Sequence, residues 1–169
     1  MSKVNQDLAT KTQQFLDQAT AEEMTIVSNL IDGLSEKRDG KYHTYLAAIT
    51  QISSCFLENG DYEIKLPIQP LIMNPLNMLH GGMTATLLDT TMGSLVNRSL
   101  PTDLAAVTSE MNIHFIKPGV GEYVRCIATI THRGTHTYIS EAKVYDEREK
   151  LIAMATGTFF ILNKPTQLK

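Results

Sequence analysis

The sequence has few cysteines and no long apolar run, and each shortage excludes a class of protein. Cys55 and Cys126 are its only cysteines, and neither belongs to a CxxC motif or lies near a histidine pair. We therefore expect two reduced, buried thiols in a cytosolic protein rather than a disulfide framework or a metal site. The apolar runs are far shorter than the roughly 18 residues of a membrane-spanning helix, so no membrane partner is expected.

The chain also lacks an excess of either charge. Its 15 basic and 18 acidic side chains give a net charge of −3, which does not provide the basic face typical of a nucleic-acid binder. The first residues contain no apolar segment of the kind found in secretory signals, so we expect a cytoplasmic location. With 43% hydrophobic and 20% charged residues in 169, the composition is that of one globular domain.

The N-terminal part reads as helix. Thr20 and Glu23 have the spacing of a capping box, an apolar stripe of helical period follows, and Gly40 is placed to end the helix. The first eighteen residues are polar and are compatible with either a helix or a frayed arm. We interpret residues 1–44 as a helical extension that packs on the main domain or on a partner subunit.

From residue 45 to residue 169 the pattern predicts an α+β domain. The segment 49–57 and the segment 62–66, joined by the turn dipeptide Asn59-Gly60, read as a β-hairpin. A helical pattern follows, and then the period changes to two. The expected helix is 83–98, and the expected strands after it are 107–117, 123–133, 138–145 and 151–162. One long helix followed by a four-stranded meander suggests a curved antiparallel sheet wrapped around that helix.

Alternation in the first of these later strands assigns its faces. Val107 and Met111 should point to one side, and Thr108 and Glu110 to the other. Thr108 would then lie on the polar face of the strand.

The unusual residues concentrate where a loop enters the long helix. Gly81-Gly82 would place bare backbone N–H groups at the positive end of the helix, where they could hold a developing oxyanion, or the glycines could simply make a tight turn. Asp89 lies within the helix beside Leu87 and Leu88, where a desolvated carboxylate could act as nucleophile or general base. The alternative is a solvent-facing aspartate on an amphipathic helix.

Helix geometry constrains how these residues could cooperate. Asp89 lies seven residues beyond Gly82, which corresponds to about 10 Å of helical rise. A nucleophile must come within about 3–3.5 Å of the reacting carbon. If both ends of this segment are catalytic, they must therefore come from different chains, with Asp89 of one subunit facing the Gly81 amide of the other.

The sequence resembles a known family at this point. The resemblance covers about residues 45–162 and rests on three motifs: Asn74…His80-Gly81-Gly82…Asp89, the stretch from Thr108 to Pro118, and Ala155-Thr-Gly-Thr-Phe159. It is to the hotdog-fold acyl-CoA thioesterases, in the branch of the phenylacetate-degradation type. It implies a hotdog fold and sheets that join edge to edge in a homodimer, often paired into tetramers.

The resemblance also implies roles for individual residues. Asp89 matches the catalytic carboxylate, which attacks the thioester or activates water, and Gly81 matches the residue whose backbone N–H holds the thioester oxygen. Asn74 matches a residue that orients water or the carbonyl, and His80 matches a positioning residue of the loop. Thr108 falls where some members place a hydroxyl that orients water, although it could equally be a plain strand threonine.

Further expectations concern the ligand. Gly82 would allow close approach of the substrate, and Arg133 and His136 lie at a strand turn that this family often places near the CoA nucleotide, or they form an exposed hairpin tip. Asn77 departs from the glycine of many relatives, but asparagine tolerates left-handed backbone.

The resulting hypothesis is hydrolysis of an acyl-CoA to a carboxylic acid and CoA, with no cofactor and no metal ligand. The alternatives are a hotdog hydratase or dehydratase and a non-catalytic acyl-CoA sensor. The acyl group itself is left open.

Overall fold

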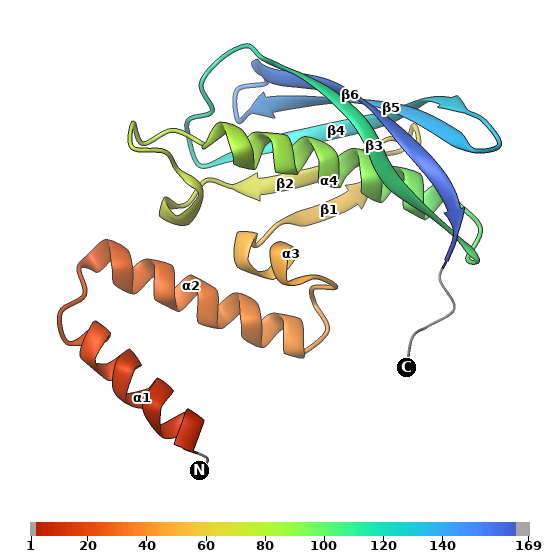
Figure 1. The fold of residues 1–169 in the computed structure, drawn as a ribbon. Helices are drawn as coiled ribbons and strands as arrows, with labels where there is room; N and C mark the ends of the chain where they lie inside the picture. The colour runs from red at the N-terminus through yellow and green to blue at the C-terminus, as the bar shows by residue number, and fades with distance from the viewer. Residues whose placement is uncertain (1–2, 165–169) are drawn as a thin grey trace. The chain divides into compact units, whose positions relative to one another are not determined.

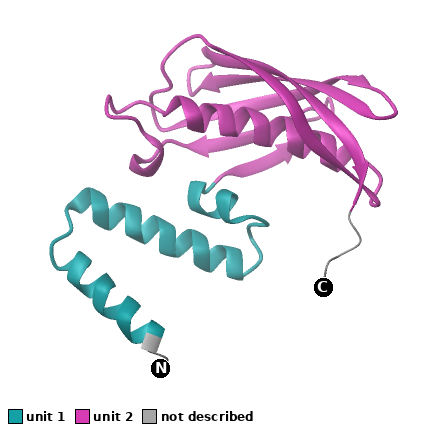
Figure 2. Cartoon of the chain, viewed as in Figure 1, with its two compact units in different colours: residues 1–51 teal, residues 52–169 magenta. Residues whose placement is uncertain are grey.

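The computed structural model describes residues 3–164, and the chain divides into two compact units, residues 1–51 and residues 52–169 (Figure 2). The predicted boundary after residue 44 lies ahead of this division, because the short helix α3 (Tyr45–Thr50) falls in the first unit.

The described part of the first unit has helices and no strand. It contains α1 (Lys3–Leu16), α2 (Ala21–Arg38) and α3. The predicted capping box is confirmed at the start of α2: the backbone N–H of Thr20 donates to the Glu23 carboxylate at 2.7 Å, and the Glu23 N–H donates to the Thr20 hydroxyl at 3.2 Å. This reciprocal pair satisfies two amides that a helix N-terminus leaves free.

Helix α3 corrects one prediction. Residues 49 and 50 were expected in a strand, but they end a helix that is capped by the Thr44 hydroxyl at one end and by a left-handed Gln51, with φ of 53°, at the other. Gly33 of α2 lies so close to the Ala48 carbonyl that a Cβ there would collide with it. Capping and this close packing override the strand preference of β-branched Ile49 and Thr50, and the strand begins only at Ser53.

The second unit is one antiparallel sheet with a long helix on one face (Figure 1). Its strand order is β1-β2-β4-β5-β6-β3, so β1 and β3 are the edges. The strands are β1 (Ser53–Phe56), β2 (Tyr62–Pro67), β3 (Leu104–Phe115), β4 (Tyr123–Arg133), β5 (Thr137–Asp146) and β6 (Leu151–Asn163). A 3₁₀ turn, η1 (Pro70–Ile72), precedes the helix α4 (Gly81–Ser99). This arrangement confirms the predicted α+β hotdog fold.

Helix α4 packs against the sheet through residues that recur every three or four positions. These buried residues are Thr84, Leu87, Leu88, Thr91, Met92, Leu95 and Val96. The spacing gives a single apolar stripe, which meets the buried side chains of the strands and forms the core. Asp89 lies just beside this stripe and is only partly buried, so it is held at the margin of the core rather than inside it.

Strand β3 carries a β-bulge that changes the predicted faces of its first half. Thr108 pairs with Phe159 of β6, and Ser109 is an extra residue without a partner. Phe159 is only 1% exposed on the face covered by α4, and paired residues share a face, so Thr108 faces the helix and Val107 faces away. The predicted placement of Thr108 opposite Met111 is wrong, because the extra residue shifts the alternation by one.

The two cysteines differ in their surroundings. Cys126 is buried, as predicted, and burial raises the pKa of its thiol to about 12. Cys55 is exposed, which corrects the expectation that both are buried, because β1 is an edge strand whose four residues are all exposed. Within residues 3–164, no helix is long and apolar enough to cross a membrane.

Candidate active site

The loop that precedes α4 is held by Asn74. The Asn74 side-chain oxygen accepts hydrogen bonds from the backbone N–H groups of Leu76, at 2.9 Å, and Met78, at 3.2 Å. Asn77 has φ of 55°, so the prediction that asparagine can replace glycine in this turn is confirmed. The side-chain oxygen of Asn74, the residue expected to orient water or a carbonyl, thus shapes the loop.

His80 and the two glycines form the start of the helix. The Nδ1 atom of His80 accepts the Gly82 N–H at 2.9 Å, and His80 is the N-cap of α4. This bond leaves the imidazole proton on Nε2 and uses the Gly82 amide. The Gly81 N–H, in contrast, has no acceptor among the described residues. Of the two glycines, Gly81 is therefore the one with an amide available to a ligand.

A cavity of about 350 Å³ opens beside Gly81. Asn74 and Gly81 both line it, together with a mostly apolar wall. The wall residues are Met78, Leu79, Thr84, Phe115, Ile116, Lys117, Pro118, Gly119 and Ile152. Residues 115–119 are far from Gly81 in the sequence and carry no periodic pattern that would predict a cavity wall. They come close to Gly81 only because of the tertiary structure.

Asp89 lies in a second cavity, of about 390 Å³. The Thr108 hydroxyl donates to Oδ1 of Asp89 at 2.7 Å, a charge-assisted hydrogen bond that fixes the carboxylate. Oδ2 of Asp89 takes no part in this bond and is available to a substrate or a water. The other lining residues are Thr90, Gly93, Ser94, Asn97, Ala106, Val107 and Phe159. The bulge in β3 is what turns Thr108 toward this carboxylate.

Four of the predicted site residues are thus gathered into two groups rather than one. Gly81 and Asn74 share the first cavity, and Asp89 and Thr108 share the second. Asp89 is eight residues beyond Gly81 in one continuous helix, which separates them by about 12 Å along its axis. A single chain therefore does not present the carboxylate and the free amide to the same carbonyl group.

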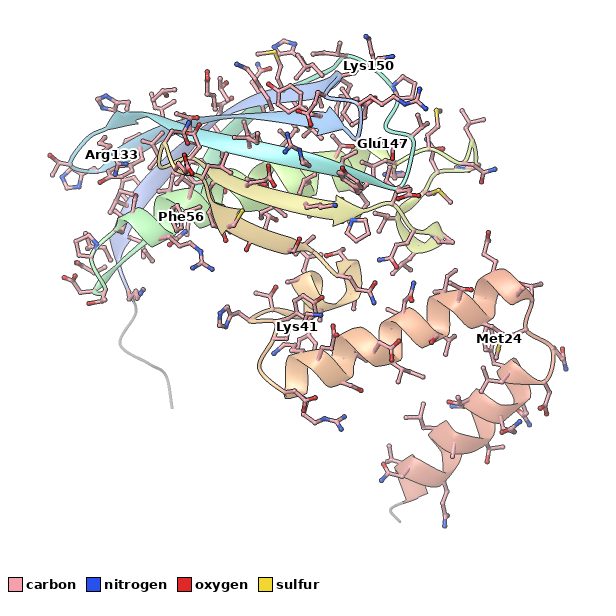
Figure 3. All side chains as sticks on the ribbon, turned by 180° about the vertical axis from the view of Figure 1, so that it is seen from behind. Met24, Lys41, Phe56, Arg133, Glu147 and Lys150 are labelled. Atoms are coloured by element: carbon pink, nitrogen blue, oxygen red, sulfur yellow. The ribbon has the colours of Figure 1, made fainter. Side chains whose placement is uncertain are left out.

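Arg133 and His136 line neither cavity. Arg133 ends β4 at the tip of the β4–β5 hairpin, where Figure 3 labels it, and its guanidinium lies 5.8 Å from the centre of the Tyr138 ring. Both side chains are exposed. Among the described residues, no three His, Cys, Asp or Glu side chains cluster as metal ligands would.

Comparison with known proteins supplies the family. The BH2602 protein from Bacillus halodurans, whose crystal structure contains CoA, is 51% identical. The alignment covers 91% of this chain and 99% of that one, with a TM-score of 0.85. Residues 76–153 match the model of the thioesterase superfamily. The chain belongs to the thioesterase superfamily. The predicted thioester hydrolase is thereby confirmed at the level of the family.

Two more distant members have named functions. The 1,4-dihydroxy-2-naphthoyl-CoA hydrolase of Listeria monocytogenes is 25% identical over 108 residues, which cover 64% of this thioesterase chain and 88% of the relative. A phenylacetic acid degradation-related protein from Ralstonia eutropha is 22% identical, with coverage of 75% and 97% and a TM-score of 0.66. At that identity the second similarity shows the fold alone.

Proposed function

We propose that this thioesterase hydrolyses an acyl-CoA at a site shared by two subunits. Two observations support this proposal. The Gly81 amide is free in one cavity, and the Asp89 carboxylate is held by Thr108 in the other. Hydrolysis of a thioester needs both groups, a donor at the carbonyl oxygen and a carboxylate at the carbonyl carbon. The presence of CoA in the crystal structure of the 51% identical relative supports CoA as the thiol.

The chemistry follows from the placement of these groups. The Gly81 N–H donates to the thioester oxygen while Oδ2 of Asp89 takes a proton from water, whose oxygen attacks the carbonyl carbon. The negative charge that develops on the carbonyl oxygen is stabilised by the Gly81 amide at the helix N-terminus. The C–S bond then breaks, and the Asp89 proton passes to the departing thiolate of CoA. In the alternative, Oδ2 of Asp89 attacks the carbonyl carbon and the C–S bond breaks to release CoA as its thiolate. Water then hydrolyses the resulting anhydride, which releases the acid and restores the Asp89 carboxylate.

The fold explains how two subunits could complete the site. Thr108, beside Asp89, lies near the middle of edge strand β3, and Phe115, beside Gly81, is the last residue of that strand. A Cβ on Gly81 would lie 3.7 Å from the Phe115 ring. In the dimer that we propose, two copies of β3 pair antiparallel in the register that puts Thr108 of one subunit opposite the partner subunit's Phe115. Asp89 then lies beside the partner subunit's Gly81, and the dimer contains two such sites.

The first experiment measures thiol release from a panel of acyl-CoAs. The wild type is compared with Asp89→Asn, and with Asp103→Asn as a control that changes an exposed carboxylate outside both cavities. We expect release by the wild type and the control, and a loss of about 10²- to 10⁴-fold in Asp89→Asn. Circular dichroism should show that all three fold alike.

Other outcomes point elsewhere. An active, folded Asp89→Asn variant would refute the proposed mechanism. Binding of acyl-CoA without release from any thioester would favour the sensor, and release of water from a hydroxyacyl-CoA would favour the dehydratase.

A mixing experiment tests the shared site. Asp89→Asn and Gly81→Pro, each inactive alone, are combined and allowed to exchange subunits. Each mixed dimer has one intact Asp89 facing one intact Gly81, so activity should return to about a quarter of the wild-type level after random exchange. A mixture that exchanges subunits but stays inactive would show that both groups act within one chain.

Assignment to the phenylacetate-degradation type branch is part of this proposal and rests on the motifs of the sequence. Pairing of dimers into tetramers is proposed on the same basis.

A further inference from the structure

The edge strand β3 is blocked near its start and open further along, because the Leu104 N–H donates to the Pro101 carbonyl and Asn97 covers Ala106. The Ala106 N–H donates to the Asn97 side-chain oxygen at 2.9 Å, and the Asn97 side-chain nitrogen donates to the Ala106 carbonyl at 3.2 Å. The same nitrogen also bonds the Gly93 carbonyl at 2.9 Å, which holds the side chain against its own helix. Asn97 thus occupies both groups that a neighbouring strand would use at Ala106.

The direction of the backbone groups shows that this contact lies on the outer edge. In an antiparallel ladder, the N–H and C=O groups of alternate residues point to opposite sides of the strand. Ala106 pairs with Ile161, whose own N–H bonds toward the β4–β5 hairpin, at the His136 carbonyl, so Ala106 points away from β6. No strand of the described chain lies on that side of β3.

Beyond the bulge, the alternation leaves a row of open positions. By the register with β6, Thr108, Met111, Ile113 and Phe115 direct their N–H and C=O groups to the free edge. An unprotected edge of this kind is a template for another strand, and proteins commonly block the parts that must not pair.

We infer that Asn97 is a stop that ends the pairing surface of β3 at Ala106 and thereby fixes how two copies of this chain align. The inference rests on the proposed function, because its consequence is the placement of Asp89 opposite the partner's Gly81. With the stop in place, only the stretch from Thr108 to Phe115 is open to the partner strand. Although Asn97 lines the Asp89 cavity, its side-chain amide is engaged with Ala106 and Gly93, so we assign it as a positioning residue that acts on the alignment.

The register names the centre of the pairing. Within the chain, Thr108 pairs with Phe159 of β6 and Phe115 pairs with Ala153. Thr156 lies midway between these two β6 residues, and it pairs with Asn112, which is therefore the centre of the open stretch. The Asn112 backbone groups point to β6, so Asn112 would meet its own copy as a non-hydrogen-bonded pair, with Cα atoms about 4.5 Å apart. Its side chain is exposed, and a cysteine there would be within reach of a disulfide with its counterpart.

Cross-linking tests the alignment without any substrate. In a Cys55→Ser background, which removes the exposed native thiol, Asn112→Cys should form a disulfide-linked dimer on mild oxidation. Adding Asn97→Ala opens Ala106 to pairing, and we expect the cross-linked fraction to fall several-fold. In the chain with native Asn112, Asn97→Ala should lower kcat about 10²-fold with KM changed by no more than about twofold, because the reacting groups are displaced.

A rescue separates this role from simple stabilisation of the helix. Ala106→Pro removes the edge-facing N–H, and proline is tolerated where a strand's N–H faces solvent. In the Asn97→Ala background, Ala106→Pro should restore both the cross-link at position 112 and kcat. Asn163→Ala, an exposed asparagine at the end of β6, is the control that should change neither.

Two results would overturn the inference. One is a cross-linked fraction that Asn97→Ala leaves unchanged, even if stability falls. The other is a complete absence of the Asn112→Cys cross-link. If the wild type releases thiol from no thioester while the cross-link still responds to Asn97→Ala and Ala106→Pro, the proposed function fails and the edge stop stands.

Discussion

Replacing Gly81 with proline would delete one N–H group and leave the start of α4 in place. Gly81 is the first residue of the helix, where proline is favoured because its fixed φ suits the first turn. The preceding His80 has φ of −62° and ψ of 133°, the extended conformation that a residue before proline prefers. A Cβ on Gly81 would meet the Phe115 ring at 3.7 and 3.9 Å, which is ordinary van der Waals contact.

We therefore expect Gly81→Pro to keep or increase the stability of the fold and to decrease its activity. The Gly81 N–H has no acceptor among the described residues, so its loss breaks no bond of the fold. The stiffer residue should leave the melting temperature unchanged or raise the free energy of unfolding by about 0.4–1 kcal/mol. Loss of an oxyanion donor, in contrast, raises the barrier by about 2.7–4 kcal/mol, a decrease of about 10²- to 10³-fold in kcat.

Gly81→Ala is the matched control. It adds the same Cβ but keeps the N–H, so the difference in kcat between alanine and proline measures the amide alone. Thiol release with the preferred acyl-CoA gives the rates, and thermal unfolding followed by circular dichroism gives the stabilities. If Gly81→Pro is folded and turns over as fast as Gly81→Ala, the Gly81 amide does not hold the oxyanion and the site must be assigned differently.

Three further predictions concern the fold. At pH 8 a thiol-reactive disulfide reagent should modify only the exposed Cys55 in the native chain and both cysteines after denaturation. Burial raises the pKa of the Cys126 thiol to about 12 and excludes the reagent, so two fast-reacting thiols in the native protein would contradict this. Gly157→Ala should lower the free energy of unfolding by about 1–3 kcal/mol in urea titrations, since its Cβ would press to 3.1 Å from the end of Met92, and an unchanged midpoint would refute the packing. Gly33→Ala should loosen α3 from α2 and speed proteolysis within residues 1–51; a cleavage rate equal to that of the wild type would show that this contact is dispensable.

The predictions that the structure confirms concern elements whose sequence signals are local. The strand expected at 123–133 is observed as Tyr123–Arg133, and the helix expected at 83–98 is observed as Gly81–Ser99. Alternation, helical period and the Asn59-Gly60 turn each depend on residues within a few positions of one another, so a single chain segment carries the whole signal. The capping box at Thr20 belongs to the same class.

Predictions failed where a distant segment decided the outcome. Residues 49 and 50 have strand preferences, yet the capping of α3 and its packing on Gly33 hold them in a helix. The alternation in β3 gave the wrong face for Thr108, because nothing in the sequence marks Ser109 as an unpaired residue. A bulge is defined only by the partner strand, which lies about 50 residues further along the chain.

The candidate site divides in the same way. The sequence by itself placed Gly81 and Asp89 on one helix, and the rise of a helix then keeps them too far apart to serve one carbonyl within a chain. Only the tertiary structure brought Thr108 to the Asp89 carboxylate, put Phe115 beside Gly81 and left β3 at the edge with Asn97 on Ala106. Spacing along a helix follows from local backbone geometry, whereas contacts between a helix and an edge strand depend on how the whole sheet closes around its core.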